Sequence, residues 1–484
     1  MKRNTPMPEL VKLFWLVPGF CFLLISNGRI AIPLAAWVAP VFFLKAIRKT
    51  PLLPAFLLGT ASYAGSYAIS WNGMVPISWL PPLIGLLWFI PIIADRFIVP
   101  RLPHFLASFV FPSAMVVIEF INALVNPMGT WSSIAYSQYG LSSILQLSSI
   151  GGTYIITFLV SWTAAVITGW WELEWNVYHC KKQLAVLAFI IIISIIWGNL
   201  RIHRISRREG TISVASVTTE EHPRQKWGEL GDLVDAGEFS AAADLRHIQN
   251  EKAFDWLGLL AGTKADAVFT HEMAFSTDSK GEKVLLEEAS KKAREIGTWV
   301  VFSFEVSEPE LRYENRVTVF SPEGYAVSEQ YKFGGAAIEG FTTVGDGEPS
   351  NFTIENSKIA VYICWDMDFP RIVRKLGKEK FDIVIVPAAD WREIDPMHTR
   401  MAVFRAVENG VSMVRQTAEG LSLACDPAGT TISKLDHFTA GRLEMFSEVP
   451  AKGVWTFYSL AGDWFAWLSV LMFLLLFFKA VLKR

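Results

Sequence analysis

The sequence predicts a membrane-embedded helical bundle joined to a water-soluble α/β domain, and three observations support this fold class. Of 484 residues, 52% are hydrophobic and only 19% are charged, against about 25% charged in typical soluble proteins. Residues 1–199 carry 16 charged side chains, whereas residues 200–462 carry 70. Residues 463–484 are apolar again until a basic end. This distribution excludes a disordered or collagen-like chain and predicts a transmembrane bundle at 1–199, a soluble domain at 200–462 and a C-terminal transmembrane helix with a short tail at 463–484.

About eight apolar segments have the length and composition of membrane-spanning helices, which need about 20 residues. They lie at 11–26, 30–46, 52–70, 75–94, 104–125, 150–171, 183–199 and 463–481. Lys and Arg cluster in alternate connections, at 45–49, 96–101 and 181–182, so the positive-inside rule makes these connections cytoplasmic. The soluble domain then lies on the exoplasmic side. Glu119 interrupts the fifth segment, and we expect it near the outer helix end in contact with water rather than as a buried partner or substrate contact.

From about residue 210 the pattern changes to short β-rich runs that alternate with amphipathic helical segments. The β-rich runs lie at 211–217, 265–272, 298–306, 316–324, 358–366, 381–390 and 411–417. The helical segments lie at 240–262, 284–296 and 396–409. Short apolar strands bounded by charged helices predict an α/β sandwich with buried strands.

Cys364 closes an apolar strand, which is where α/β folds place reactive groups. Its position alone leaves three interpretations open: a nucleophile, a buried inert thiol, or one half of a disulfide with Cys425. Glu272 ends the run ADAVFTHE, and Lys332 follows the run GYAVSEQY. A carboxylate, an ammonium and a thiol at three strand ends suit an amidase or acyltransferase, in which the thiolate attacks, the carboxylate takes the proton and the lysine stabilises the tetrahedral intermediate.

The order Glu272, Lys332, Cys364, in the contexts THE, YKFGG and YICWDMDFP, resembles the Glu-Lys-Cys triad of the nitrilase superfamily. Residues 404–433 resemble the later strand pair of that superfamily. The chain as a whole resembles the apolipoprotein N-acyltransferase family more specifically, because several predicted membrane spans precede the nitrilase-like domain and one span follows it. Two further stretches also resemble that family, at 128–162 and 458–471.

The sequence departs from the family's pattern near the expected site. The family's Val-Pro-Phe-Gly-Glu segment is replaced by residues 333–339, in which Glu339 stands for the family's glutamate. The family's Cys-Tyr-Glu becomes Cys364 followed by Trp365 and Asp366, and its Asn-Thr-Gly becomes residues 418–420. By resemblance, Glu339, Trp365 and Asp366 support the site or bind substrate, in a family member or a divergent paralogue.

The resemblance implies a nitrilase-like αββα catalytic domain that transfers an acyl chain from a membrane phospholipid to the N-terminal amine of a diacylglyceryl-cysteine lipoprotein. Cys364 would form a thioester, Glu272 would remove the amine's proton, and Lys332 with the backbone N–H beside the cysteine would hold the oxyanion. The implied location is the bacterial inner membrane, multi-pass, with the catalytic domain on the periplasmic face. We expect a monomer that binds no nucleic acid and needs no cofactor. We also expect no metal, since the eight His residues show no metal-ligand spacing.

Two other functions stay open. A membrane-tethered amidase or nitrilase would use the same triad on a small C–N substrate, with water as the second nucleophile. A non-catalytic membrane binding protein would make Cys364 dispensable. We favour the acyltransferase, because its membrane spans hold a soluble fold against a bilayer that contains both expected substrates.

The segment Phe333–Gly347 holds five glycines in fifteen residues, directly after Lys332. Such a segment has a high backbone entropy cost of ordering. It is interpreted either as a lid that opens for lipid and excludes water from the thioester, or as an ordinary glycine-rich surface loop.

Overall fold

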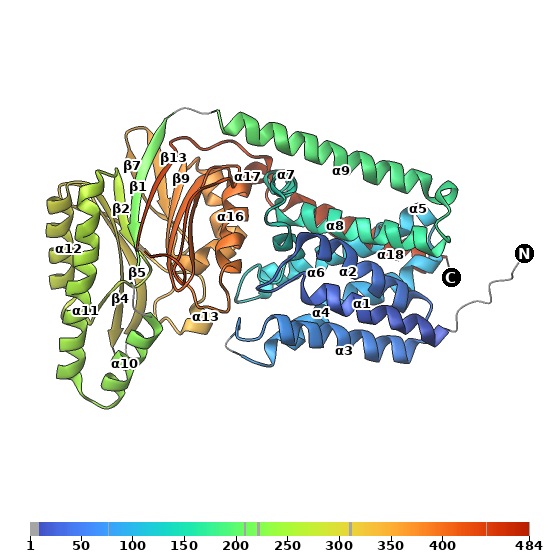
Figure 1. The fold of residues 1–484 in the computed structure, drawn as a ribbon, viewed down its shortest axis with the longest axis horizontal. Coiled ribbons are helices and arrows are strands. Elements are labelled where there is room, and N and C mark those ends of the chain that lie inside the picture. The colour runs from blue at the N-terminus through green and yellow to red at the C-terminus, as the bar shows by residue number, and fades with distance from the viewer. Residues whose placement is uncertain are drawn as a thin grey trace, which may run out of the picture. The chain divides into compact units, whose positions relative to one another are not determined.

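The computed structural model describes residues 9–75, 77–207, 210–219, 223–308, 312–441 and 443–483. Contacts divide the chain into a helical unit of residues 1–125, 130–201 and 461–484, and an α/β unit of residues 126–129 and 202–460 (Figure 1). The predicted pairing of a membrane helical bundle with an α/β domain is confirmed. The predicted domain boundaries near residues 200 and 463 stay predictions.

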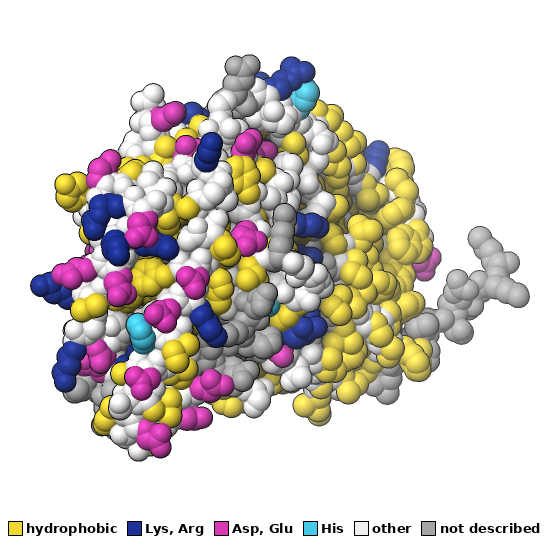
Figure 2. Space-filling view, turned by 60° about the vertical axis from the view of Figure 1, so that its left-hand side comes forward, with side chains coloured by type: hydrophobic (Ala, Val, Ile, Leu, Met, Phe, Trp, Pro, Cys, Tyr) yellow, Lys and Arg dark blue, Asp and Glu magenta, His cyan; other side chains and the backbone are white. Residues whose placement is uncertain are grey.

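Six of the described helices are long and apolar enough to cross a membrane. These spans are Leu52–Ser70 (α3), Leu80–Arg101 (α4 and a 3-10 turn), His104–Val125 (α5 and α6), Ser148–Glu172 (α8), Val177–Ile205 (α9) and Trp464–Val481 (α18). The first two predicted spans form shorter helices, α1 (Leu16–Leu24) and α2 (Pro33–Arg48), and α7 (Ser142–Leu145) is one turn. The count of eight spans therefore stays a prediction. Hydrophobic side chains crowd the surface of this unit in Figure 2, as a lipid-facing surface requires.

Glu119 corrects one expectation about the helical unit. It lies in α6 (Val110–Val125) and is only 3% exposed, so it is not the water-contacting carboxylate that the sequence suggested. Its oxygens accept hydrogen bonds from Thr157 Oγ1 at 2.7 Å, Ser133 Oγ at 2.9 Å and the Ile134 backbone N–H at 2.7 Å. These donors satisfy the buried charge and tie the turn after α6 to α8.

Two β-sheets form the centre of the α/β unit. The first has the order β13 (Glu444–Pro450), β1 (Thr211–Val217), β2 (Ala267–Thr270), β4 (Trp299–Glu308), β5 (Arg312–Phe320), β6 (Ala326–Tyr331), with β3 (Phe275–Thr277) also paired to β4. The second has the order β12 (Thr431–Asp436), β11 (Leu421–Cys425), β10 (Ser412–Ala418), β9 (Ile383–Ala389), β8 (Ser357–Val361), β7 (Ser350–Ile354). Strands β1, β2 and β4 run parallel, as do β8, β9 and β10. The carboxyl ends of each parallel set meet at one edge of its sheet, where α/β folds place their sites.

Helices complete an α-β-β-α layering (Figure 1). Helices α11 (Phe239–Leu259) and α12 (Glu282–Ile296) cover the outer face of the first sheet, and α16 (Met397–Asn409) packs against β10 and β11 of the second. Apolar side chains of both sheets, among them Val214, Val317, Ile359 and Ile385, fill the layer between them. The remaining described helices of this unit are α10 (Pro223–Asp235), α13 (Ala336–Glu339), α14 (Pro370–Val373), α15 (Lys375–Lys378) and α17 (Phe457–Ala461).

Candidate active site

Three charged side chains form an ionic cluster in the α/β unit: Glu272 and Lys332 lie just after strands β2 and β6, and Glu339 ends the short helix α13. Lys332 follows β6, and its Nζ lies 2.7 Å from Glu272 Oε1 and 2.7 Å from Glu339 Oε2. Lys332 and Glu272 are each about 1% exposed, while the Glu339 side chain is 27% exposed. Burial by itself lowers the pKa of Lys332, but Glu272 and Glu339 outweigh it and hold that pKa well above its usual value. The lysine is therefore a fixed ammonium between two carboxylates.

Backbone and amide donors orient the Glu272 carboxylate. Glu272 is the second residue after β2, and the next residue, Met273, has a φ of 51°, so the chain turns sharply there. Asn315 Nδ2 donates to Glu272 Oε1 at 2.6 Å, and the Ala389 backbone N–H donates to Glu272 Oε2 at 2.9 Å. The carboxylate is held in one orientation by groups from both sheets.

Cys364 begins a 3-10 turn, η5 (Cys364–Asp368), just beyond β8, as the strand-end prediction required. Its φ of 43° is in the left-handed region that non-glycine residues rarely adopt, and its side chain is buried. Its Sγ donates to the Ala389 carbonyl at 3.8 Å, so Ala389 contacts both the thiol and Glu272. This residue joins the base and the nucleophile expected from the sequence.

The Cys364 thiol is protonated in this environment. Burial raises its pKa well above the usual value, and Glu272 adds to the rise, while Lys332 and Arg415 oppose it. Lys332 therefore lowers the pKa of the Cys364 thiol, but by less than burial raises it. A nucleophilic role requires that a base remove the proton during attack.

The disulfide interpretation of Cys364 is excluded. Cys364 and Cys425 are both free and buried, and Cys425 lies in β11 within the second sheet. Two interpretations of Cys364 remain, a nucleophile and a buried inert thiol. The charged groups near Cys364 favour the nucleophile.

Asp366 positions the chain on both sides of the cluster. Its Oδ1 accepts from the backbone N–H groups of Phe333, at 2.9 Å, and Gly334, at 2.7 Å. Its Oδ2 accepts from the Ile363 backbone N–H at 3.0 Å and from Gln330 Nε2 at 2.8 Å. Burial raises its pKa to about 7, against these bonds. Asp366, which is one methylene shorter than the family's glutamate, thus connects the turn that contains Cys364 to the residues after Lys332.

Trp365 forms a wall against which the glycine-rich segment packs. A Cβ at Gly334 would lie 2.6 Å from the Trp365 carbonyl carbon, and a Cβ at Gly335 would lie 2.5 Å from the Trp365 ring. Gly335 also has a φ of 83°. Gly345 and Gly347 are also closely packed, against the Tyr331 carbonyl and the Ile372 side chain. Four of the five glycines therefore serve close packing, which the entropy argument from the sequence did not identify.

A second buried ionic cluster beside Cys364 was not identified from the sequence. His398 Nδ1 lies 2.7 Å from Asp390 Oδ1, and its Nε2 lies 2.9 Å from Asp368 Oδ2. Arg415 donates to both Asp390 oxygens, at 2.8 and 3.0 Å. Burial by itself lowers the pKa of His398, but Asp368 and Asp390 raise it to about 9. Two signals were present: Asp390 ends a strand as Cys364 does, and a charge within the buried run VSMVRQT requires a buried partner.

Cys364, Asp390 and His398 offer ligand atoms within 4.8 Å of one another, in the combination that zinc prefers. However, both ring nitrogens of His398 are hydrogen-bonded, and Arg415 grips both oxygens of Asp390. The Arg415 guanidinium places a positive charge beside these three residues, whereas a metal cation is stabilised by additional anionic ligands. The trio therefore fits the ionic cluster better than a metal.

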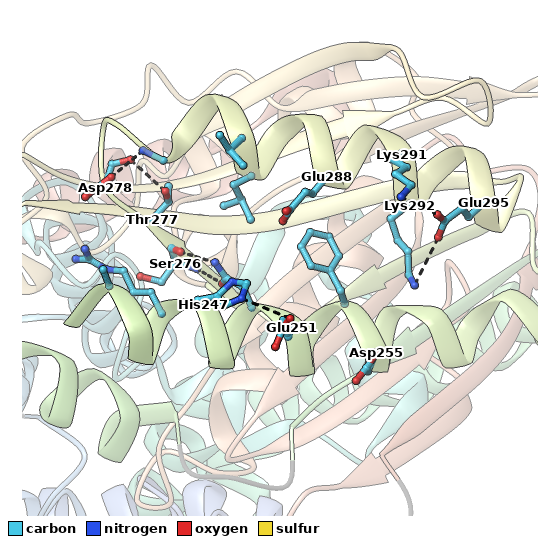
Figure 3. Close-up of a pocket in the computed structure, with 17 residues that line it drawn as sticks. His247, Glu251, Asp255, Ser276, Thr277, Asp278, Glu288, Lys291, Lys292 and Glu295 are labelled. Atoms are coloured by element: carbon cyan, nitrogen blue, oxygen red, sulfur yellow. Dashed lines mark hydrogen bonds and ion pairs between the residues drawn. The ribbon is translucent and has the colours of Figure 1, made fainter. Parts of the chain in front are cut away.

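An open groove of about 740 Å³ between α11 and α12 contains none of the predicted site residues (Figure 3). Five of its charged side chains pair along their own helices, His247 with Glu251 and both Lys291 and Lys292 with Glu295. This pattern is that of a solvated helix surface.

Comparisons with known proteins agree with this geometry. The carbon-nitrogen hydrolase family matches residues 261–445, and the apolipoprotein N-acyltransferase N-terminal domain matches residues 19–166. The chain is 25% identical to the apolipoprotein N-acyltransferase of Geobacter metallireducens, over 96% of this chain and 90% of that protein. It is 25% identical to that of Rickettsia bellii, over 68% of this chain and 67% of that protein.

A solved amidase from Nesterenkonia sp. aligns with 50% of this chain and 92% of its own, at 17% identity and a TM-score of 0.39. The N-terminal domain match lies mostly in the helical unit and the carbon-nitrogen hydrolase match lies within the α/β unit, in the order that the sequence predicted. The chain is therefore a multi-pass membrane protein of the nitrilase superfamily and belongs to its apolipoprotein N-acyltransferase type.

Proposed function

We propose that the protein transfers an acyl chain from a membrane phospholipid to the N-terminal amine of a diacylglyceryl-cysteine lipoprotein, through a thioester on Cys364. One observation carries the proposal: a thiol, a carboxylate and an ammonium from three strand ends converge in a buried site of a membrane-embedded chain. The curated relatives over most of the chain bear the name of this activity.

In the first step, Glu272 takes the proton of the Cys364 thiol as the sulfur attacks the ester carbonyl of the lipid. Lys332 and the backbone N–H beside Cys364 stabilise the tetrahedral oxyanion. The C–O bond then breaks, and the leaving alkoxide takes the proton from Glu272 as lysophospholipid. The raised pKa of the thiol makes this general base necessary, since a free thiolate is not present before attack.

In the second step, the acceptor amine attacks the thioester carbonyl and gives a proton to Glu272. The C–S bond breaks, and the thiolate recovers the proton. Exclusion of water between the two steps separates transfer from hydrolysis, because water competes with the amine for the same thioester.

Mass spectrometry of the full chain in phospholipid nanodiscs tests the proposal. Without acceptor, we expect an added acyl mass on the peptide that contains Cys364 and release of lysophospholipid. Cys425→Ala is the matched control, because that thiol is also free and buried but the charged group that acts on it is the Asp426 carboxylate, and the variant should still be acylated at Cys364. Cys364→Ala should show no adduct.

The same experiment distinguishes the alternatives. Addition of a diacylglyceryl lipopeptide should remove the adduct and give the N-acylated peptide. An adduct that decays to free fatty acid with the lipopeptide left unchanged would indicate a hydrolase. No adduct at all, with the lipopeptide also unmodified, would indicate a non-catalytic binding protein.

We further propose that the α/β unit lies on the exoplasmic, periplasmic face of the inner membrane, which rests on the positive-inside pattern. A reporter fused at residue 300 should be active only in the periplasm, and one fused after the last residue only in the cytoplasm. A cytoplasmic signal from the fusion at 300 would overturn this orientation.

A further inference from the structure

A short amphipathic segment at the end of the α/β unit carries exposed apolar side chains that the proposed chemistry does not use. Trp455 is 70% exposed, Leu460 is 68% exposed and Phe457 is 39% exposed. The residues between them point the other way: Thr456, Tyr458 and Ser459 are at most 4% exposed. The segment thus has one face packed on the protein and one apolar face directed outward.

Hydrogen bonds fix this segment to the α/β unit. Thr456 Oγ1 donates to the Glu408 carbonyl at 2.6 Å, and the Val454 backbone N–H donates to the Gly410 carbonyl at 2.7 Å. Both acceptors lie at the C-terminal end of α16. The outward direction of Trp455 and Leu460 is therefore set by the fold and is not the result of a free linker.

A segment rich in basic residues packs against the protein-facing side of this segment. Ser459 packs so closely on Gly377 of α15 that a Cβ at Gly377 would collide with it. Residues 371–380 around Gly377 contain five basic residues and one acidic residue. We define the α17 surface as the three exposed apolar residues together with the basic residues of 371–380, which are all exposed or half-buried: Trp455, Phe457, Leu460, Arg371, Arg374, Lys375, Lys378 and Lys380.

The chain itself places this surface near lipid. The membrane helix α18 begins at Trp464, four residues after Leu460, and has a mean hydropathy of 2.1. Four residues span at most about 14 Å even when fully extended. Leu460 therefore lies close to the start of a transmembrane helix however the two units are arranged. Trp beside Leu, with adjacent Lys and Arg, is the composition of segments that bind at the boundary of headgroups and acyl chains.

We propose that the α17 surface rests on the bilayer, with its apolar side chains at the acyl boundary and its basic side chains against lipid phosphates. The proposal goes beyond the acyl-transfer chemistry and does not depend on it. Lipid contact would also restrain the site through α16. The C-terminal end of α16 is hydrogen-bonded to the segment that contains Trp455 and Leu460, and His398 near the start of α16 is bonded to the turn that contains Cys364.

A lipid-quenching experiment on the full chain in nanodiscs tests the proposal. Leu460→Cys and Leu259→Cys are labelled with the same environment-sensitive fluorophore, in a background with Cys21→Ser and Cys364→Ala; the other two cysteines are buried. Leu259 is the matched control, an exposed leucine of α11 with 58% exposure. Spin-labelled phospholipid should remove most of the emission at position 460 and little at 259, while aqueous iodide should do the reverse.

Charge reversal supplies a second arm. Lys378→Glu with Lys380→Glu should reduce lipid quenching at position 460 in discs that contain anionic lipid, and less so in purely zwitterionic discs. Iodide quenching at 460 equal to that at 259 would overturn the proposal. Protection of position 460 from both quenchers would also overturn it, because protein rather than lipid would then cover the surface. The measurement needs no turnover, so its failure is distinct from failure of the proposed acyl transfer.

Discussion

Two buried ionic clusters act on Cys364, and they differ in how completely their charges are matched. In the Lys332 cluster one ammonium serves two carboxylates, Glu272 and Glu339, and one of these is partly exposed. In the His398 cluster two cations serve two carboxylates, and all four side chains are at most 3% exposed.

This difference suits the Lys332 cluster to proton transfer and the His398 cluster to holding the geometry of the site. A cluster with an excess carboxylate and a path to solvent can accept and return a proton, as a general base must. A closed, charge-balanced cluster is costly to disturb and therefore fixes geometry. Asp368 ends the turn that begins with Cys364, and Asp390 follows Ala389, so the His398 cluster holds both segments that contact the thiol.

The largest expected effect comes from breaking the Lys332 cluster at its base. Glu272→Gln keeps the shape and the Asn315 neighbour but cannot take a proton, so turnover should fall by about 10²–10⁴-fold. The rate of lipopeptide N-acylation measures this loss. Thermal unfolding should change much less, because Lys332 keeps Glu339 as a partner. Activity close to that of the unsubstituted chain would remove Glu272 from the mechanism.

A matched pair of glycines tests the lid interpretation. Gly335 and Gly340 have similar positive φ values, 83° and 79°, so Ala costs about 1–2 kcal/mol of backbone strain at either position. Only Gly335 is packed against Trp365, whereas a Cβ at Gly340 would meet nothing within 4 Å. We expect Gly335→Ala to lower turnover strongly by displacing Trp365 and the adjoining nucleophile turn.

Gly340→Ala leaves the packing intact and alters only the backbone freedom of the segment. If the segment is an ordinary loop, the ratio of free fatty acid to N-acylated product should stay unchanged in this variant. A raised ratio would support a lid that excludes water from the thioester. The pair separates packing from motion, which a double substitution of Gly334 and Gly335 cannot do.

The His398 cluster should reveal itself through stability and its pH dependence. Because the folded pKa of His398, about 9, exceeds the unfolded value of about 6.5, its stabilisation is complete below about pH 6.5 and is lost as pH rises through about 9. His398→Asn should lower the melting temperature at pH 6 and flatten the decline between pH 6.5 and 9. Near-UV circular dichroism follows the transition. An unchanged slope in the variant would assign the pH dependence to other groups.

The smallest effect is expected at Cys425, which lies outside both clusters. Cys425→Ala should leave N-acylation intact and cost about 1 kcal/mol as a small core substitution. Loss of activity equal to that of Cys364→Ala would show that the two thiols act together.

Local sequence patterns located part of the elements of this protein: the seven predicted β-rich runs contain or overlap β1, β2, β4, β5, β8, β9 and β10, whereas strands such as β7 and β13 lie outside them. The run TISVASV became β1 at Thr211–Val217, and the apolar run at 52–70 became α3 with the same bounds, because periodicity and hydropathy act over neighbouring residues. The strand-end rule located Glu272, Lys332 and Cys364, and the structure brings the first two into contact and places the third in their field.

The tertiary structure alone decided the charge states and the support of the site. Glu119 was expected to meet water and is buried, because donors from α8 and the turn after α6 close over it. Asp390, His398 and Arg415 form one cluster with Asp368 only when β9, β10, α16 and the turn after β8 are packed together. Desolvation depends on every atom that surrounds a group and not on its neighbours in sequence, so the sequence determined which residues end the strands, and packing determined which of them are paired and which hold protons.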